Sequence, residues 1–154
     1  MLTVDGESSL GNGTEVAVVN EGGGREIPIY DHLSAHTAYI IAFYRHRPKV
    51  IANLQKMIAD YTASVTSSMG LLGSGCRLIN CRTIKNVKVG PGGIIEGVDR
   101  LENGSVNSRP QDTVYIGASL IATDSTCCTG AKITDDTRLS RTFVSQVTLV
   151  AKQH

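Results

Sequence analysis

The sequence predicts a mainly β fold, a parallel β-helix of three-sided coils that is interrupted by a helical hairpin. Three observations predict this fold. Aliphatic residues recur at a spacing of 17, with steps of six, six and five within each period. Glycine and asparagine fill many of the positions between them. The stretch from residue 32 to residue 65 instead lacks glycine and repeats its apolar residues with a helical period.

The 17-residue repeat runs through the second half of the chain. A helix would return every 3.6 residues and a half-buried strand every two, so neither explains the steps of six. Three short strands per coil would stack residues of successive coils at the roughly 4.8 Å spacing of strands. Leu78 with Ile95 and Ile84 with Leu101 keep this spacing of 17. Two longer series keep it as well: Leu72, Val89 and Val106, then Ile116, Ile133 and Val150. The two series are separated by a ten-residue insertion, which we expect to project from a corner.

Small residues mark the expected corners of the coils. Gly90, Gly92, Gly93 and Gly97 suit tight corners, where a Cβ atom would strain the backbone or crowd the next coil. The corner asparagines Asn86 and Asn103 are also 17 residues apart. We therefore expect a ladder in which stacked asparagine side chains satisfy backbone groups and each other.

An interruption is predicted near the N-terminus. Val4, Leu10 and Val16 are six residues apart and predict one more coil, so that residues 17 to 70 interrupt the solenoid. Within this interruption, residues 32 to 67 are expected to form an inserted helical hairpin.

The hairpin is expected to contain two helices. Asp31 or Ser34 is expected to cap the first, which runs to about Arg45 and should be the more buried, and Pro48 suits the first turn of the second. The second carries one apolar stripe, formed by Ile51, Leu54, Ile58, Tyr61 and Val65.

Composition places the chain among single-domain proteins. Its 154 residues, 41% of them hydrophobic, suit one domain over residues 1 to 154. A net charge of +1 favours neither nucleic acid nor a membrane as partner. We expect a cytoplasmic protein, because no signal peptide or long apolar run is present. The four cysteines do not have zinc-site spacing, so we predict no metal site and interpret them as buried thiols.

Several separated blocks carry a resemblance to a known family. They are GNGTEVAVVNEGGGREIPIYDHLSAHTAYIIAFYRHRPK, TIKNVKVGPGGIIEGVDRLENGSVNS and LSRTFVSQ, in this order. The chain resembles long bacterial hexapeptide-repeat proteins described as related to UDP-N-acetylglucosamine pyrophosphorylases. The resemblance covers roughly residues 1 to 146 and implies a left-handed parallel β-helix. Because members of that family are much longer, we expect the chain to be a fragment, and the segment 144–154 does not match the expected final coil.

Candidate site residues cluster around the predicted hairpin. His36 is the candidate catalytic base, with Glu21, Glu26 or Asp31 as an orienting group. The alternative is a histidine hydrogen-bonded at the start of a helix.

The remaining candidates are polar residues that suit a sugar or a phosphate. Asn20, Glu21, Arg25 and Glu26 form one group, although they also suit a local ion-pair cluster. Arg45 and Arg47 suit a phosphate clamp or the neutralisation of helix carbonyls. Asn103 and Asn107 are weaker candidates, beside a loop that also carries Arg109.

Two functions stay open at this point. The first is a noncatalytic module of a sugar-nucleotide-related transferase-like protein, able to self-associate as a trimer, as many hexapeptide β-helices do. The second is an acyl- or nucleotidyltransferase module that acts on a nucleotide sugar with His36 as general base. Fold analogy alone supports the second, and the sequence does not identify a cofactor.

Overall fold

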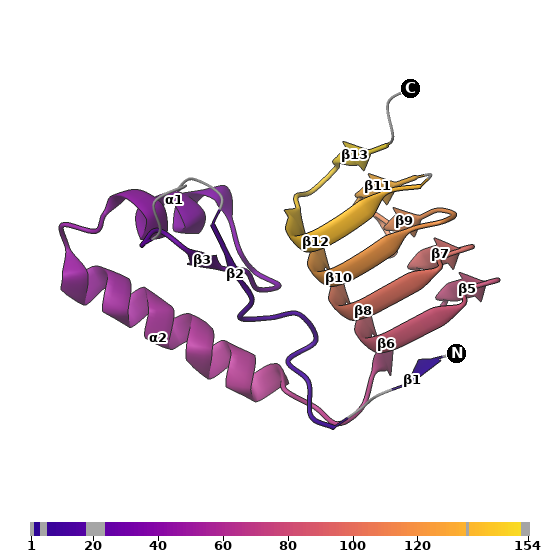
Figure 1. The fold of residues 1–154 in the computed structure, drawn as a ribbon, viewed down its shortest axis with the longest axis horizontal. Coiled ribbons are helices and arrows are strands. Elements are labelled where there is room, and N and C mark those ends of the chain that lie inside the picture. Colours follow the sequence, from indigo (N-terminus) through magenta and orange to yellow (C-terminus); the bar gives the residue numbers. More distant parts are fainter. Residues whose placement is uncertain (1, 4–5, 18–23, 135, 152–154) are drawn as a thin grey trace.

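A computed structural model describes residues 2–3, 6–17, 24–134 and 136–151. A β-solenoid forms one end of the molecule and a helical insertion forms the other (Figure 1). The predicted fold class, a parallel β-helix interrupted by helices, is therefore confirmed. Residues 1, 4–5, 18–23, 135 and 152–154 lie outside the described part of the chain.

The solenoid consists of two parallel sheets. The first contains β1, β4 and the long strands β6, β8, β10 and β12, and the second orders its strands β13-β11-β9-β7-β5. The strands are β1 Leu2–Thr3, β4 Leu71–Leu72, β5 Arg77–Ile79, β6 Thr83–Val89, β7 Ile94–Glu96, β8 Arg100–Val106, β9 Tyr115–Ile116, β10 Ile121–Cys127, β11 Lys132–Ile133, β12 Arg138–Val144 and β13 Leu149–Val150. The predicted 17-residue register is confirmed by the pairing of Leu72 with Val89 and of Val89 with Val106.

Each long strand turns a corner at its central residue and supplies two sides of a coil. The central residues have a positive φ, and strand pairing skips them: Asn86, Asn103, Asp124 and Arg141. The short strand that follows supplies the third side. The coils are therefore three-sided, as predicted.

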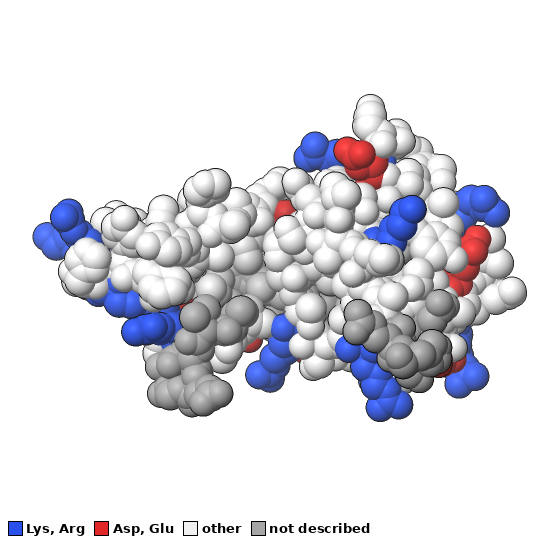
Figure 2. Space-filling view, turned by 90° about the horizontal axis from the view of Figure 1, so that it is seen from above, with Lys and Arg blue, Asp and Glu red and all other residues white. Residues whose placement is uncertain are grey.

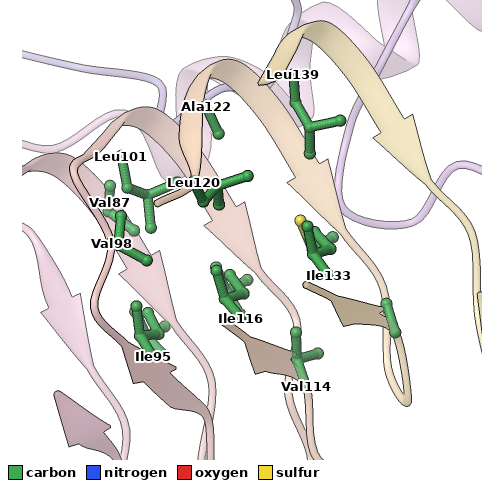
Figure 3. Close-up of a cluster of buried hydrophobic side chains, with 14 of the residues drawn as sticks. Val87, Ile95, Val98, Leu101, Val114, Ile116, Leu120, Ala122, Ile133 and Leu139 are labelled. Atoms are coloured by element: carbon green, nitrogen blue, oxygen red, sulfur yellow. The ribbon is translucent and has the colours of Figure 1, made fainter. Parts of the chain in front are cut away.

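The core is a stack of aliphatic side chains inside this tube. Ile95, Ile116 and Ile133 come from successive coils and pair in register along the second sheet (Figure 3). All three are fully buried. Burying one such side chain stabilises the fold by about 1.5–3 kcal/mol, so the stack supplies much of the driving force for folding.

The predicted asparagine ladder is present at the corner inside the long strands. Asn86 Nδ2 donates to Asn103 Oδ1 at 3.2 Å, and Asn103 Nδ2 donates to Asp124 Oδ1 at 3.3 Å. Asparagine and aspartate tolerate the left-handed conformation that this corner requires. The residues of the ladder therefore pair their side-chain groups with each other and also accept the left-handed backbone conformation of the corner.

The prediction of a ten-residue insertion after Val106 is wrong, because the inserted segment is shorter. Ile95 pairs with Ile116 and Leu101 with Ala122, a register of 21 instead of 17, so this coil carries four extra residues. They form an exposed turn in which residues 109 and 112 hydrogen bond to each other. The prediction failed because Val106 and Ile116 lie on different sides of one coil, and the residues between them are mostly part of that coil.

The predicted N-terminal coil is also wrong. Val16 belongs to β2 (Glu15–Val16), which pairs antiparallel with β3 (Ile27–Pro28) in the insertion. Val4 lies outside the described residues. The first coil is shared instead by β1, which pairs with residues 84–85, and β4, which pairs with residues 88–89. The chain leaves the solenoid between them, at the corner that Asn86 occupies in the next coil.

The insertion is larger than the predicted hairpin and has its own core. An antiparallel bridge between Ser8 and Ser67 closes its base. The helices are α1 (Ala35–Phe43), capped by Ser34 as predicted, and α2 (Pro48–Val65), with Pro48 in its first turn. They form a separate cluster of buried residues with β2 and β3. Of the helices in the described part of the chain, neither is long and apolar enough to cross a membrane.

The segment after residue 144 continues the solenoid. Val150 of β13 pairs with Ile133 of β11, which extends the column of Ile116 and Ile133 by one coil. The 17-residue spacing thus holds beyond the end of the family-like blocks.

The corner ladder predicts a difference between two substitutions at Asn103. Asn103→Ala should lower the free energy of unfolding by about 2–3 kcal/mol. The variant loses the two hydrogen bonds of the side-chain amide, and alanine is strained at the backbone φ of 48°. Asn103→Gly relieves the strain and should cost about 1 kcal/mol less. Urea denaturation measures both values, and an equal or larger loss for the glycine variant would contradict this account.

Candidate functional site

A cleft of about 640 Å³ lies between the solenoid and the insertion. Its solenoid wall is formed by the corners that follow the long strands, with Gly90 and Pro91, Asn107 to Arg109, Cys128 and Thr129, and Ser145 and Gln146. Its other wall is formed by Asp31 to Ala35, the segment that enters α1. The volume is within the range of small-molecule sites, roughly 300–1,000 Å³.

Close stacking of the corners shapes the solenoid wall. Backbone hydrogen bonds run from Gly90 N to Val106 O, from Asn107 N to Cys127 O and from Cys128 N to Val144 O, at 2.7–2.9 Å. A Cβ atom at Gly90 would lie 2.4 Å from the carbonyl oxygen of Ser108. Glycine is therefore required there, and the cleft presents groups from successive coils about 4.8 Å apart.

An ion pair with a buried carboxylate and a partly exposed lysine joins the two walls of the cleft. Lys88 Nζ lies 2.9 Å from Asp31 Oδ2, and the Tyr61 hydroxyl donates to the same oxygen at 3.1 Å. The Asp31 backbone N–H donates to Asn12 Oδ1 at 2.8 Å, and the Asp31 carbonyl accepts from Asn107 Nδ2 at 3.3 Å. Asp31 thus connects the solenoid to α2 and to the first turn of the insertion.

The surroundings of Asp31 keep its carboxylate ionised. Burial alone would raise the pKa of Asp31, but the hydrogen bond and charge of Lys88, with the Tyr61 hydroxyl, more than offset it and lower the pKa. Burial and the charge of Asp31 raise the pKa of Tyr61 to about 12. Asp31 Oδ1 is buried without a hydrogen-bond partner within the described residues. At neutral pH the cleft therefore contains a paired carboxylate, which also accepts a hydrogen bond from the protonated phenol of Tyr61.

The thiols near the cleft are protonated at neutral pH. Burial, with a contribution from the charge of Asp31, raises the pKa of Cys128 to about 11. Burial raises the pKa of Cys127, on the core side of the same strand end, to about 12. A thiol is a weak nucleophile in this form. The interpretation of these two cysteines as buried packing residues is confirmed.

The polar groups of the cleft suit a phosphorylated, hydroxyl-rich ligand. Arg109 is exposed at the turn beside the cleft, and His32 is exposed at its rim with its ring edge-on to Tyr61 at 5.3 Å. Ser145 and Gln146 contribute hydroxyl and amide groups. Guanidinium groups bind phosphate oxygens, and amides bind sugar hydroxyls.

The structure places His36 outside this cleft. It lies in the first turn of α1 with its side chain exposed, and the lining of the cleft ends at Ala35. Of the expected orienting groups, Asp31 is bound to Lys88, and Glu26 Oε1 accepts from the Gly24 N–H at 2.8 Å. Glu21 lies outside the described residues. The described carboxylates are thus engaged by groups other than His36.

The other site residues predicted in the insertion do not form one cluster in the described part of the chain. Arg45 Nη2 donates to the Glu26 carbonyl at 3.3 Å, so these two residues come together. Arg47, which precedes α2, and Arg25 are exposed. Asn20 lies, like Glu21, outside the described residues. Arg45 is thus directed to the backbone of the insertion, whereas a phosphate clamp would need it free.

Asn103 and Asn107 have different roles. Asn103 belongs to the corner ladder, whereas Asn107 lines the cleft. Sequence reasoning missed Lys88, His32, Ser145 and Gln146. One available signal was the repeat itself, since Lys88 alternates with the inward-facing Val87 and Val89 and must point outward.

The chain matches a family profile over residues 1–154, for the family described as Domain of unknown function (DUF4954). The chain belongs to this family. It is also similar to an uncharacterized protein of Treponema pallidum (strain Nichols), with 29% identity over 99 residues, which are 64% of the chain and 14% of that protein. The chain thus corresponds to a small part of this relative. No solved structure gave a significant match.

The Asp31–Lys88 pair predicts acid-dependent stability. Asp31→Asn should lower the free energy of unfolding at pH 7 by about 2 kcal/mol, less than the roughly 3–5 kcal/mol of a fully buried pair, because part of Lys88 is exposed. The folded-state pKa of Asp31 lies below the unfolded value of about 4. Its stabilisation is therefore complete above that pH and is lost as the pH falls through the folded-state pKa.

Urea denaturation between pH 7 and pH 2 tests this effect. The difference between wild type and Asp31→Asn should shrink below about pH 4. Asp99→Asn is the matched control, because its pair with Arg82 at 3.7 Å is exposed and should contribute less than about 0.5 kcal/mol. A difference that stays constant with pH would show that the ion pair does not couple the insertion to the solenoid.

Proposed function

We propose that this chain is the β-solenoid module of a cytoplasmic, sugar-nucleotide-related transferase-like protein and that its cleft binds the nucleotide sugar. In this proposal the module binds and positions its ligand without performing the chemistry. The observation that carries the proposal is the cleft itself, where Lys88, Arg109 and His32 lie beside the amide and hydroxyl groups of successive coils.

The charges of the cleft support an anionic ligand. The charges of Asp31 and Lys88 cancel each other, so the cleft has a net positive charge from Arg109. About a third of the Lys88 side chain is exposed, so it can still contact a phosphate oxygen. A diphosphate would satisfy both cations, and the hydroxyls of a sugar would pair with Asn107, Ser145 and Gln146.

The protonation states argue for binding rather than catalysis. The carboxylate of Asp31 is held ionised by Lys88, which makes it a poor general base, and the Cys128 thiol stays protonated. Covalent chemistry needs an activated nucleophile, and neither group provides one.

The blocks that carry the family resemblance also support the nucleotide-sugar ligand. IYDHLSAH contributes the insertion wall of the cleft, GPGG and SVNS contribute two corners, and FVSQ contributes Ser145 and Gln146. Blocks that are far apart in the chain thus supply one cleft.

A transferase remains the second candidate because one histidine lies at the cleft. His32, rather than the predicted His36, borders the cleft and is exposed. A histidine there can accept a proton from a hydroxyl or amine that attacks an acyl or nucleotidyl group. This candidate requires that a second substrate reach the same cleft.

Self-association as a trimer is also part of the proposal. Hexapeptide β-helices commonly associate through their flat faces, and the outward side chains of β11 and β13, Lys132 and Leu149, are exposed. Sedimentation equilibrium measures the oligomer directly, and a monomer at high concentration would exclude it.

Calorimetric titration with UDP-N-acetylglucosamine tests the binding. We expect a saturable heat, and Arg109→Gln should weaken the affinity by about tenfold, because one charge-assisted contact to phosphate is lost. Arg138→Gln is the matched control, because Arg138 is exposed at the start of β12 and does not line the cleft. Absence of binding by the wild type, or equal loss in both variants, would refute the proposal.

A turnover assay separates the two candidates. With the nucleotide sugar and an acyl-thioester donor, the binding proposal predicts no product from wild type. Product formation that His32→Asn abolishes and His36→Asn preserves would establish the transferase instead.

A further inference from the structure

The insertion ends in an exposed cluster of aromatic and cationic side chains. It lies where α1 passes into α2, at the end of the molecule opposite the solenoid (Figure 1). The rings of α1 and its cap are 43–56% exposed, and Val50 is 43% exposed. We define the tip as Tyr39, Phe43, Tyr44, Arg47, Lys49 and Val50.

The stretch of chain that contains the tip is basic although the whole chain has a net charge of only +1. Residues 32 to 59 contain no Asp or Glu, whereas Arg45, Arg47, Lys49 and Lys56 are all in this stretch. Figure 2 shows Lys and Arg side chains at this end of the molecule and others over the solenoid, where Asp and Glu side chains lie among them. The composition of the whole chain averages out this asymmetry.

The rings of the tip stack on each other instead of being buried. Tyr39 and Phe43 have centroids 4.9 Å apart, and Tyr44 contacts Tyr39 edge-on at 6.2 Å. α1 is nevertheless the more buried helix, as expected: Ile41 and Ala42 are buried among its nine residues, whereas α2 buries Ile51 and Ile58 among 18. An exposed apolar cluster of this kind marks an interaction surface.

We propose that the tip docks on a lipid surface with anionic headgroups. Tyr39, Phe43 and Tyr44 would lie at headgroup depth, where aromatic rings are favoured. Arg47 and Lys49 would contact the lipid phosphates. The contact is peripheral, and the solenoid with its cleft stays in water.

Charge and shape favour this partner over other partners. A second copy of the chain would bring two basic tips together, and like charges repel. Protein partners need a large complementary patch, whereas a lipid surface adapts to a small convex tip.

Vesicle co-sedimentation with the full chain tests the proposal. Vesicles of phosphatidylglycerol and phosphatidylcholine should bind the chain, and pure phosphatidylcholine should bind it at least tenfold less. Each cation near an anionic surface contributes about fivefold, so Arg47→Glu with Lys49→Glu should lower binding at least 25-fold. Phe43→Ser should lower vesicle binding about tenfold, and added salt should weaken vesicle binding by the wild-type chain.

Matched controls lie on the solenoid. Arg77→Glu with Arg138→Glu makes the same charge change, and Leu71→Ser removes a side chain that is 48% exposed, as is that of Phe43. All substituted positions are exposed, so circular dichroism should show folded variants. Absence of vesicle binding, equal losses in tip and control variants, or binding to polyglutamate or single-stranded RNA but not to vesicles would each overturn the proposal.

Discussion

The register between successive coils is the constraint on which the rest of the structure depends. Once Val89 lies beside Val106 and Ile95 beside Ile116, the inward side chains form one continuous core. The same register stacks the corners, because each corner continues the backbone hydrogen bonds of the strand before it. The glycines and the ladder around Asn103 let the chain turn where this register demands it.

The cleft is a consequence of these stacked corners and of the insertion beside them. The corners alone form an open ridge, and residues 31–35 turn the ridge into a cleft. The insertion is held there by a polar network around Asp31, in which Lys88, Tyr61 and Asn107 all take part. Under the proposed function, ligand binding at the cleft would be coupled to the contact between the two parts, because Lys88 would contact both the ligand and Asp31.

The insertion has two ends with different chemistry. Its end beside the solenoid carries Asp31 to Ala35, which line the cleft, and its tip carries stacked rings and exposed cations. Docking through the tip would keep the cleft accessible, because the cleft is lined by residues 31–35 and by the solenoid, whereas α1 passes into α2 at the far end of the insertion (Figure 1). A module of this design would bring a bound nucleotide sugar close to an anionic surface.

The sequence by itself determined the repeat of the solenoid and the approximate positions of the two helices. The spacing of 17, the ladder of Asn86 and Asn103, and the roles of Ser34 and Pro48 all follow from contacts between neighbouring coils or within one turn. Such contacts repeat along the chain and leave a periodic pattern. Only the tertiary structure decided that Val16 belongs to the insertion, that the extra loop is short, and that His32 rather than His36 borders the cleft. These features depend on single contacts, such as that between Asp31 and Lys88, 57 residues apart, and one contact across such a distance leaves no periodicity to detect.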